Sequence, residues 1–313
     1  MTSVAPRRPA PVAPSLTLAV VGDVHDQWSE ADGAALQHLG VDLALFVGDF
    51  GNEAVALVRQ IAHLDLPKAV ILGNHDAWYS ATPWGHKKCP YDRRQEDWVA
   101  QQLQDLGDCH VGYGALDLPS LGLSVVGGRP FSWGGSAWTN APFYAERYGV
   151  NSLEESIDRL CRAVDATAHD HLIFIGHCGP QGLGSAPEDP CGRDWNPIGS
   201  DFGDPDLAAA ITYAQAQGKT VSLVAFGHMH HTLRHRKDRL RRQIHSEGST
   251  IYLNAARVPR WRQQDGHTQR HFALVTLQGQ RVIRARQAWV DDQRGLVQAS
   301  DLLTPREEVA AVV

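Results

Sequence analysis

The stretch VILGNHDAWY (residues 70–79) places three hydrogen-bonding side chains directly after an apolar run. Residues 68–73 have the composition of a buried strand closed by glycine, and Asn74, His75 and Asp76 follow at once. A buried strand that ends in an amide, an imidazole and a carboxylate indicates a binding or catalytic edge. The same design recurs at four more strand ends.

Apolar runs alternate with amphipathic segments through the first part of the chain. The strand-like runs, each closed by glycine, are LTLAVVG (16–22), DLALFVG (42–48) and KAVILG (68–73). The segments between them, at 30–40 and 53–66, have helical spacing and good helix formers. This alternation predicts parallel strands joined by crossover helices.

The rest of the chain predicts a second set of strands. Strands are expected at 121–128, 171–177 and 221–228, and helices at 96–107 and 152–168, the latter opening with a Ser152–Glu155 capping box. After residue 228, the runs STIYLN, HFALVTL and QRVIRAR are typical of strands joined by turns. The predicted fold class is α/β, with two packed mixed sheets and helices outside.

The predicted domain organisation is a single domain at residues 15–288. The Pro- and Ala-rich residues 1–14 are expected to be a disordered lead-in, because they lack the apolar core of a secretory signal. Residues 289–313 are expected to be either a tail or a packed edge. Two connections, 129–151 and 178–206, are too long for simple turns and are candidates for binding surfaces.

Composition excludes several classes of protein. The net charge of −6 disfavours a generic nucleic-acid binder, and no apolar run approaches the ~20 residues that span a bilayer. Five scattered cysteines, with no CxxC pair, argue against a disulfide framework and a cysteine-based zinc site. They favour a reducing, cytoplasmic location.

Polar side chains follow directly after five of the predicted strands. Ligands bind outside the carboxyl ends of the strands in open α/β sheets, so these side chains are expected to meet at one edge. The set comprises Asp23, His25, Asp49, Asn74, His75, His177, His228 and His230.

Carboxylate, imidazole and amide ligands without thiolate suit divalent Mn, Fe or Zn. So many ligands indicate two ions rather than one, and an aspartate can bridge them. Two ions about 3.5–4 Å apart can share a hydroxide and stabilise the attacking and leaving oxygens of an in-line displacement. The set therefore predicts phosphoester hydrolysis.

The ordered motifs DxH, GD, GNHD, GH and GHxH resemble the calcineurin-like metallophosphoesterase superfamily over roughly residues 16–256. The resemblance implies a two-sheet αββα sandwich with the metal site at the carboxyl ends of the strands. It implies that Asp23, His25 and His230 hold the first metal, that Asp49 bridges, and that Asn74, His177 and His228 complete the second. His75 would stabilise the phosphoryl charge and protonate the leaving group.

Several stretches are similar to an uncharacterised branch of this superfamily found in cyanobacteria and plants: GDFGNE, LPKAVILGNHDAWY, GGRPFSWGG and GHCGP. The protein Ser/Thr phosphatases carry an acidic–arginine run after the bridging aspartate and GNHE in the third motif. Here Phe50, Gly51, Asn52 and Glu53 follow Asp49, and the third motif ends in Asp76. A protein phosphatase of that type is therefore disfavoured.

Four features in or near the motifs have two interpretations each. Arg129 follows a strand end and could bind a substrate phosphate, or could form an ion pair on a loop. The aromatic residues of 129–151, among them Trp133, could line a substrate wall or pack the loop onto the body. The basic run 234–242 could be a solvated face or a contact for an anionic substrate or nucleic acid. Asp76 is expected to orient the backbone or His75, with a direct catalytic role as the alternative.

The predicted function is hydrolysis of a small phosphomonoester or phosphodiester by a dinuclear centre. The alternatives are a non-catalytic metal- or phosphate-binding regulator, and a nuclease that uses residues 234–242. The presence of both Asp49 and His75 favours catalysis over the regulator, and the net charge counts against the nuclease. The sequence does not indicate an oligomeric state.

Overall fold

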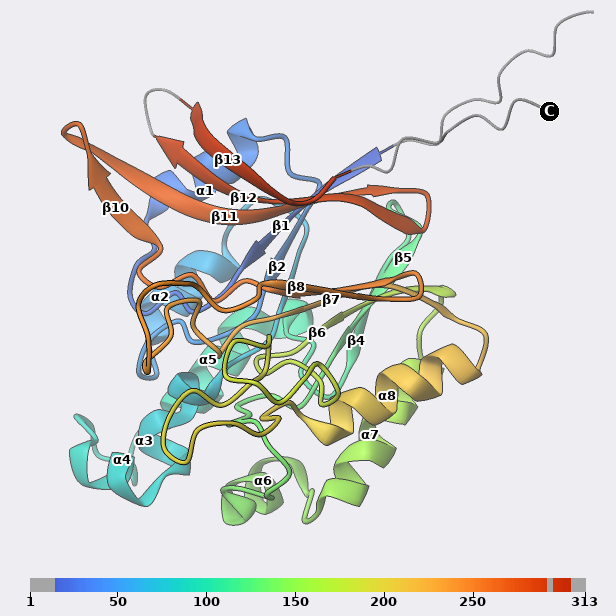
Figure 1. Ribbon diagram of the computed structural model, residues 1–313. Helices are drawn as coiled ribbons and strands as arrows, with labels where there is room; N and C mark the ends of the chain where they lie inside the picture. The colour runs from blue at the N-terminus through green and yellow to red at the C-terminus, as the bar shows by residue number, and fades with distance from the viewer. Residues whose placement is uncertain (1–14, 292–294, 305–313) are drawn as a thin grey trace, which may run out of the picture.

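Two β-sheets pack face to face in the computed structural model, and helices cover their outer sides (Figure 1). This arrangement confirms the predicted αββα sandwich. The structure describes residues 15–291 and 295–304. The predicted lead-in at 1–14 therefore lies outside the described residues, as do 292–294 and 305–313 of the predicted C-terminal segment.

The first sheet has the strand order β13-β12-β11-β1-β2-β3, with β10 paired to β11. Strands β1, β2 and β3 are parallel, as their crossover helices require, while β11 runs antiparallel to β1. The bounds are β1 Ser15–Val21, β2 Leu43–Phe46, β3 Lys68–Val70, β10 Trp261–Gln264, β11 His267–Gln278, β12 Arg281–Asp291 and β13 Gly295–Leu303.

The second sheet has the order β4-β5-β6-β7-β9-β8. Strands β5, β6, β7 and β9 are parallel, and β4 and β8 close the two edges as antiparallel strands. The bounds are β4 Ala115–Leu118, β5 Leu123–Gly127, β6 His171–Ile175, β7 Thr220–Phe226, β8 Ile244–Glu247 and β9 Thr250–Asn254.

The helices include several that the sequence pattern did not indicate, namely α3, α4, α6 and α8. Helix α6 divides the long connection at 129–151. None of the helices in the described part of the chain is long and apolar enough to span a bilayer. The bounds are α1 Glu30–His38, α2 Val55–Ala62, η1 Asn74–Ala77, α3 Trp78–Ala81, α4 Pro83–Lys88, α5 Trp98–Leu106, η2 Gly107–Cys109, α6 Ala141–Tyr148, α7 Leu153–Asp165 and α8 Pro205–Ala216.

Helix α8 carries a start signal that the sequence analysis did not use. Asp204 is its N-cap and Pro205 is its first residue, a combination that favours helix initiation because proline has no N–H to leave unpaired. At the other end of the chain, β12 continues past residue 288 and β13 pairs along it as an edge strand. The sheet therefore extends beyond the domain boundary expected at 288.

Alternate residues of each central strand enter two different apolar layers. In β1, Leu18 and Val20 belong to the layer between the sheets, whereas Ala19 and Val21 belong to the layer under the helices. Burial on both faces explains why these strands read as continuous apolar runs. It also places every strand end of the two sheets within one compact body.

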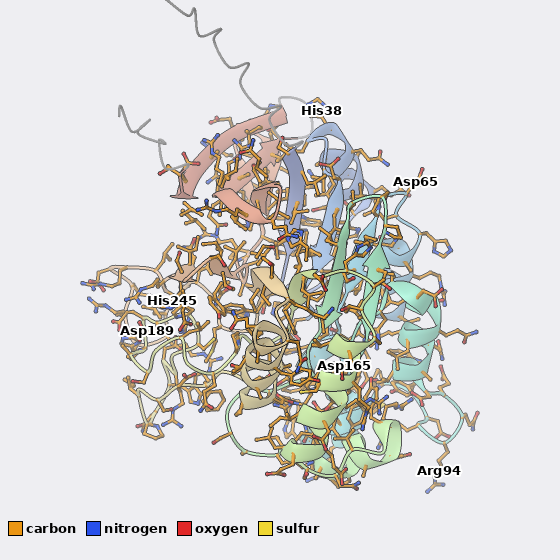
Figure 2. All side chains as sticks on the ribbon, turned by 90° about the vertical axis from the view of Figure 1, so that its right-hand side faces the viewer. His38, Asp65, Arg94, Asp165, Asp189 and His245 are labelled. Atoms are coloured by element: carbon orange, nitrogen blue, oxygen red, sulfur yellow. The ribbon has the colours of Figure 1, made fainter. Side chains whose placement is uncertain are left out.

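The crossover helices run back against the strands, so their carboxyl ends mark the end of the sandwich where the parallel strands begin. Figure 2 shows His38, the last residue of α1, and Asp65, just after α2, at one end of the molecule. The carboxyl ends of β1, β2 and β3 point the opposite way. The polar side chains that follow these strands therefore share one edge.

Arg129 is buried in an ion-pair cluster, which corrects the tentative expectation that it binds substrate. Its guanidinium lies 2.7 Å from Asp204 and 3.0 Å from Asp206, and the residue is only 2% exposed. Ser132 also donates a hydrogen bond to Asp204. Burial raises the pKa of Asp204 to about 6 although the charge of Arg129 opposes the shift. The ion pair holds the 129–151 connection against the start of α8.

Replacement of Arg129 by alanine is expected to destabilise the protein by about 3–5 kcal/mol, because two carboxylates would be left buried without a cation. Urea unfolding measured by circular dichroism tests this. The matched control is Arg59→Ala, which removes a half-exposed arginine paired with Asp105 and is expected to cost about 0–1 kcal/mol. Equal losses in the two variants would contradict the structural role of Arg129.

Candidate metal centre

The eight side chains predicted at the five strand ends lie together at the carboxyl edge of the two sheets. They come from loops that follow β1, β2, β3, β6 and β7. Six of them form two groups, and within each group the potential ligand atoms lie within 4.8 Å of one another. The first group is Asp23, His25 and His230, and the second is Asp49, His177 and His228.

The first group brings two imidazoles against one carboxylate. The Nε2 atoms of His25 and His230 lie 3.2 Å apart, and His230 Nε2 lies 3.3 Å from Asp23 Oδ1. The backbone N–H of His228 donates to both oxygens of Asp23 at 3.0–3.1 Å and fixes the carboxylate. Three potential ligand atoms therefore face a common point.

The amide oxygen of Asn74 lies against the second group. Asn74 Oδ1 lies 2.9 Å from His177 Nε2 and 2.9 Å from His228 Nδ1. His177 Nε2 also lies 3.3 Å from Asp49 Oδ1. The four predicted ligands of a second metal are thus brought together.

Asp49 belongs to the second group and also faces the first. Its Oδ1 faces His177, whereas its Oδ2 lies 3.9 Å from His25 Nε2 of the first group. Oδ1 also accepts a hydrogen bond from the backbone N–H of His75 at 2.9 Å. The two oxygens of one carboxylate therefore point towards different groups, which is the geometry that a bridging ligand needs.

The donor set of the second group fits a cation. His177 Nδ1 lies 2.8 Å from the carbonyl oxygen of Val47, and this contact requires the proton to be on Nδ1. A neutral His177 then directs the lone pair of Nε2 at the oxygens of Asn74 and Asp49 and at Nδ1 of His228. Lone pairs that converge without a hydrogen between them repel, and a divalent cation would remove that repulsion.

The acid–base properties of the cluster show the same need for positive charge. Burial opposes ionisation of Asp49, but the charge and hydrogen bond of His177 lower the pKa of Asp49 below its usual range. Burial acts to lower the pKa of His177, but Asp49 raises it to about 10. Burial and the charge of His177 lower the pKa of His228 to about 3. The carboxylate of Asp49 and the imidazole of His177 therefore each stabilise the charged form of the other.

The backbone that presents these side chains is strained. Asp23, His25, Asp49 and His228 all have positive φ, between 44° and 64°. L-residues rarely adopt this left-handed conformation, and it costs about 1–3 kcal/mol where it occurs. Strain at four candidate ligands of one cluster indicates that their placement is functional.

Two of the glycines that close the strands allow a carboxylate of the cluster to lie close to the backbone. A Cβ on Gly73 would lie 2.4 Å from Asp49 Oδ1, and a Cβ on Gly227 would lie 2.3 Å from Asp23 Oδ2. Any side chain at either position would displace a carboxylate of the cluster. This explains why the strand ends carry glycine directly before the polar residues.

Asp76 orients the backbone, which is one of the two roles expected of it. Its carboxylate is fully buried and accepts hydrogen bonds from the N–H groups of Asp49, Phe50 and Gly73 at 2.7–2.9 Å. These bonds tie the loop after β2 to the loop after β3. Asp76 therefore sets the distance between Asp49 and Asn74.

His75 is held beside the two groups without belonging to either. Its Nδ1 lies 2.7 Å from Asn52 Oδ1, so Nδ1–H donates to the amide and Nε2 remains available. Its ring stacks on Trp78 with a centroid distance of 4.8 Å and meets His25 edge-on at 5.1 Å. Burial lowers the pKa of His75 although the charge of Asp49 opposes the shift.

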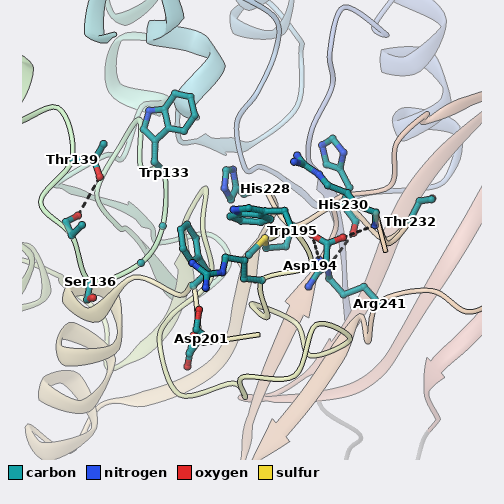
Figure 3. A pocket seen from close by; sticks show the side chains of 18 residues that line it. Trp133, Ser136, Thr139, Asp194, Trp195, Asp201, His228, His230, Thr232 and Arg241 are labelled. Atoms are coloured by element: carbon teal, nitrogen blue, oxygen red, sulfur yellow. Dashed lines mark hydrogen bonds and ion pairs between the residues drawn. The ribbon is translucent and has the colours of Figure 1, made fainter. Parts of the chain in front are cut away.

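A cavity of about 660 Å³ opens beside both groups (Figure 3). His228 and His230 form part of its lining, and most of the remainder comes from the two long connections at 129–151 and 178–206. Of the aromatic residues considered in the first connection, Trp133 lines the cavity, whereas Phe143 and Tyr144 are buried away from it. Arg129 does not line the cavity.

Three of the six arginines and lysines in the basic run at 234–242 are paired with acidic residues of the 178–206 connection. Arg236 lies 2.9 Å from Glu188, Arg242 lies 3.2 Å from Asp189, and Arg241 is buried against Asp194. The run is closed by an isolated bridge between Thr232 and Leu240. Half of these cations therefore fix one loop to another.

Several residues of this region lie outside the set predicted from the sequence. Asn52 was noted only as a departure from another pattern, although its position in GDFGNE, next to the bridging candidate, was a usable signal. Trp195, Phe202 and Arg193 line the cavity but lie in a loop without periodicity. Their roles depend on how that loop folds back onto the site.

Comparison with solved structures finds similar architectures at low sequence identity. GAP50, the anchor in the inner membrane complex of Plasmodium, is 11% identical, with a TM-score of 0.47 and coverage of 94% of this chain and 90% of that chain. The protein TT1561 of Thermus thermophilus is 13% identical, with a TM-score of 0.47 and coverage of 85% and 99%. A dimetal phosphatase from Danio rerio is 11% identical, with a TM-score of 0.47 and coverage of 92% and 98%.

A comparison with curated protein sequences finds no match. The sequence does match the family description "Calcineurin-like phosphoesterase" over residues 16–232. That span contains all five strand ends and every residue of the two groups. The chain belongs to the calcineurin-like phosphoesterase family.

Proposed function

We propose that this chain is a metal-dependent phosphoesterase with a dinuclear centre, acting on a small phosphorylated substrate. Asp23, His25 and His230 would hold one ion, and Asn74, His177 and His228 the other. The observation that carries the proposal is the position of Asp49, whose two oxygens face different groups. Divalent ions bound there supply a nucleophilic oxygen at neutral pH and neutralise phosphoryl charge. Mn, Fe and Zn all accept these ligands.

His75 is proposed to be the proton donor to the leaving group. Asn52 accepts from Nδ1–H, so Nε2 of the protonated ring carries the proton that the leaving oxygen needs. The lowered pKa makes the imidazolium a stronger acid. Asn52 and the stacked ring of Trp78 would act as positioning groups, because they fix the plane and the tautomer of the imidazole.

The two alternative functions have less support. A non-catalytic regulator has no use for a bridging carboxylate and a separately held imidazole in one site. A nuclease has less support because Glu188, Asp189 and Asp194 pair with three of the six arginines and lysines of the 234–242 run, and the net charge of the protein is −6. Assignment to the cyanobacterial and plant branch and a cytoplasmic location stay predictions from the sequence.

Asp49→Asn is expected to abolish hydrolysis of every ester. The neutral amide removes the bridging charge, so the loss should exceed the about 100-fold that removal of an outer partner of a metal ligand costs. Hydrolysis of an aryl phosphomonoester and its diester is measured on metal-stripped protein refilled with manganese, and bound manganese is counted by atomic absorption. Asp65→Asn, an exposed aspartate after α2, is the control. Full activity in Asp49→Asn would refute the bridging role.

His75→Ala is expected to retain metal and lose about 10²–10⁴-fold in rate. Because the imidazole protonates the leaving group, p-nitrophenyl phosphate should lose less than an alkyl phosphate, whose alkoxide is the poorer leaving group. The measurement is kcat for both esters at saturating manganese, with His63→Ala, an exposed histidine after α2, as the control. Equal losses for the two esters would argue against proton donation by His75.

A further inference from the structure

The cavity beside the two metal-binding groups is much larger than a phosphoryl group. Its volume of about 660 Å³ falls within the range of small-molecule sites, about 300–1,000 Å³. Because His228 and His230 belong to different groups and both line it, a phosphoester bound at the groups would place the rest of its structure in this space. The chemistry of the lining therefore reports on the substrate.

The first feature of the lining is aromatic. Trp133 comes from one long connection, and Trp195 and Phe202 come from the other; all three are half-buried. Figure 3 shows Trp133 and Trp195 around the same space as His228. Trp133 also packs on Trp78, which stacks on His75. Such surfaces favour a flat ring, since stacking on indole is available to any planar aromatic group.

The second feature is positive charge without a carboxylate partner. Within the described residues, Arg193 and Arg234 form no ion pair, and their guanidinium groups lie over Phe202 at 5.9 Å and Trp195 at 5.3 Å. Stacking holds a guanidinium by its face and leaves its N–H edge free to bind an anion. The protein as a whole has a net charge of −6, so this local excess is not a general property of the surface.

The two carboxylates of the lining have partners other than the side chains of Arg193 and Arg234. Asp201 accepts hydrogen bonds from the backbone N–H groups of Gly182 and Gly203. Asp194 lies 3.4 Å from Arg241 and accepts a hydrogen bond from the backbone N–H of Arg234. Neither carboxylate forms an ion pair with Arg193 or Arg234, and the three arginines of the lining outnumber its two carboxylates.

The two connections are fixed to each other, so the cavity is formed before a ligand binds. The N–H of Gly135 donates to the carbonyl oxygen of Phe202 at 2.8 Å, and a Cβ on Gly134 would lie only 2.4 Å from the same oxygen. Arg193 Nε donates to the carbonyl of Gly199 at 3.1 Å. A pre-formed site loses less conformational entropy on binding.

We propose that the cavity recognises a phosphoester that carries a flat aromatic ring and a second anionic group, which is the chemistry of a nucleotide with two phosphate groups. The aromatic side chains bind the ring, and Arg193 and Arg234 bind the second anion. The part of this inference that concerns a substrate rests on the proposed function. The part that concerns binding does not.

Calorimetry on manganese-loaded protein tests the binding. The probes are adenosine 5′-(α,β-methylene)diphosphate, methylenediphosphonate, which lacks the ring, and adenosine, which lacks the anions. The nucleotide analogue is expected to bind at least about tenfold more tightly than either fragment. Equal affinity of the analogue and methylenediphosphonate would overturn the inference.

Variants test whether the aromatic side chains and the two arginines account for the tighter binding of the nucleotide analogue. Trp195→Ala should remove the advantage of the analogue over methylenediphosphonate, and Trp195→Phe should restore most of it. Arg193→Gln with Arg234→Gln should weaken the analogue about tenfold or more. The controls are Trp98→Ala, a half-buried tryptophan that stacks on Tyr91 outside the cavity, and Arg239→Gln, an exposed arginine of the same basic run that does not line it. Losses of the same size in the controls would contradict the assignment.

Hydrolysis of p-nitrophenyl phosphate by the same wild-type preparation separates the two proposals. Turnover of this ester without tighter binding of the nucleotide analogue would leave the phosphoesterase proposal standing and overturn the ligand class. Tight, Trp195-dependent binding of the analogue without turnover of any ester would support the ligand class and count against the proposed function.

Discussion

The buried carboxylate of Asp76 is the interaction on which the candidate site depends. It accepts three backbone N–H groups, two from the loop after β2 and one from the loop after β3. Without these hydrogen bonds, two strand ends that present Asp49 and Asn74 would have no fixed separation. Because the bonds come from main-chain atoms, the same carboxylate also satisfies donors that the positive φ of Asp49 leaves outside any regular ladder.

Charge balance is the second constraint on this edge of the sandwich. The carboxylates of three aspartates and one imidazole are buried at this edge beside four half-buried imidazoles, and desolvation disfavours every charged form; the buried groups are Asp23, Asp49, Asp76 and His177. The pKa of Asp49 is lowered and that of His177 is raised, so the positive charge of the imidazole and the negative charge of the carboxylate stabilise each other. A pair of divalent cations would provide the same balance with stronger interactions, since carboxylate, imidazole and amide oxygen are all metal ligands.

The two long connections use buried and paired charge for a different purpose. Arg129 joins the first connection to the start of α8, and Arg241 joins the basic run to Asp194 of the second. Each of these arginines is buried and forms an ion pair with a carboxylate. Arg193 and Arg234, by contrast, rest on aromatic rings at the cavity. The distinction between structural and ligand-binding arginines therefore comes from their partners and not from their residue type.

The sequence by itself determined the sandwich and the convergence of its strand ends. Apolar runs closed by glycine and separated by amphipathic segments are local patterns, and parallel strands must present their carboxyl ends at one edge. Asp23, Asp49, Asn74 and His177 could be brought together on that argument alone. The metal-ligand roles assigned to them, and the role of His75, stay predictions that the geometry supports.

Only the tertiary structure decided what Arg129 and the basic run do. Arg129 and Asp204 are 75 residues apart, and nothing in the spacing of either segment indicates that they pair. The aromatic residues of 178–206 were not predicted for a related reason, since irregular loops have no periodicity to detect. The sequence identifies residues of the site where local pattern and strand direction are enough to determine their positions. Contacts between distant loops depend on packing, and they determine the shape and charge of the cavity.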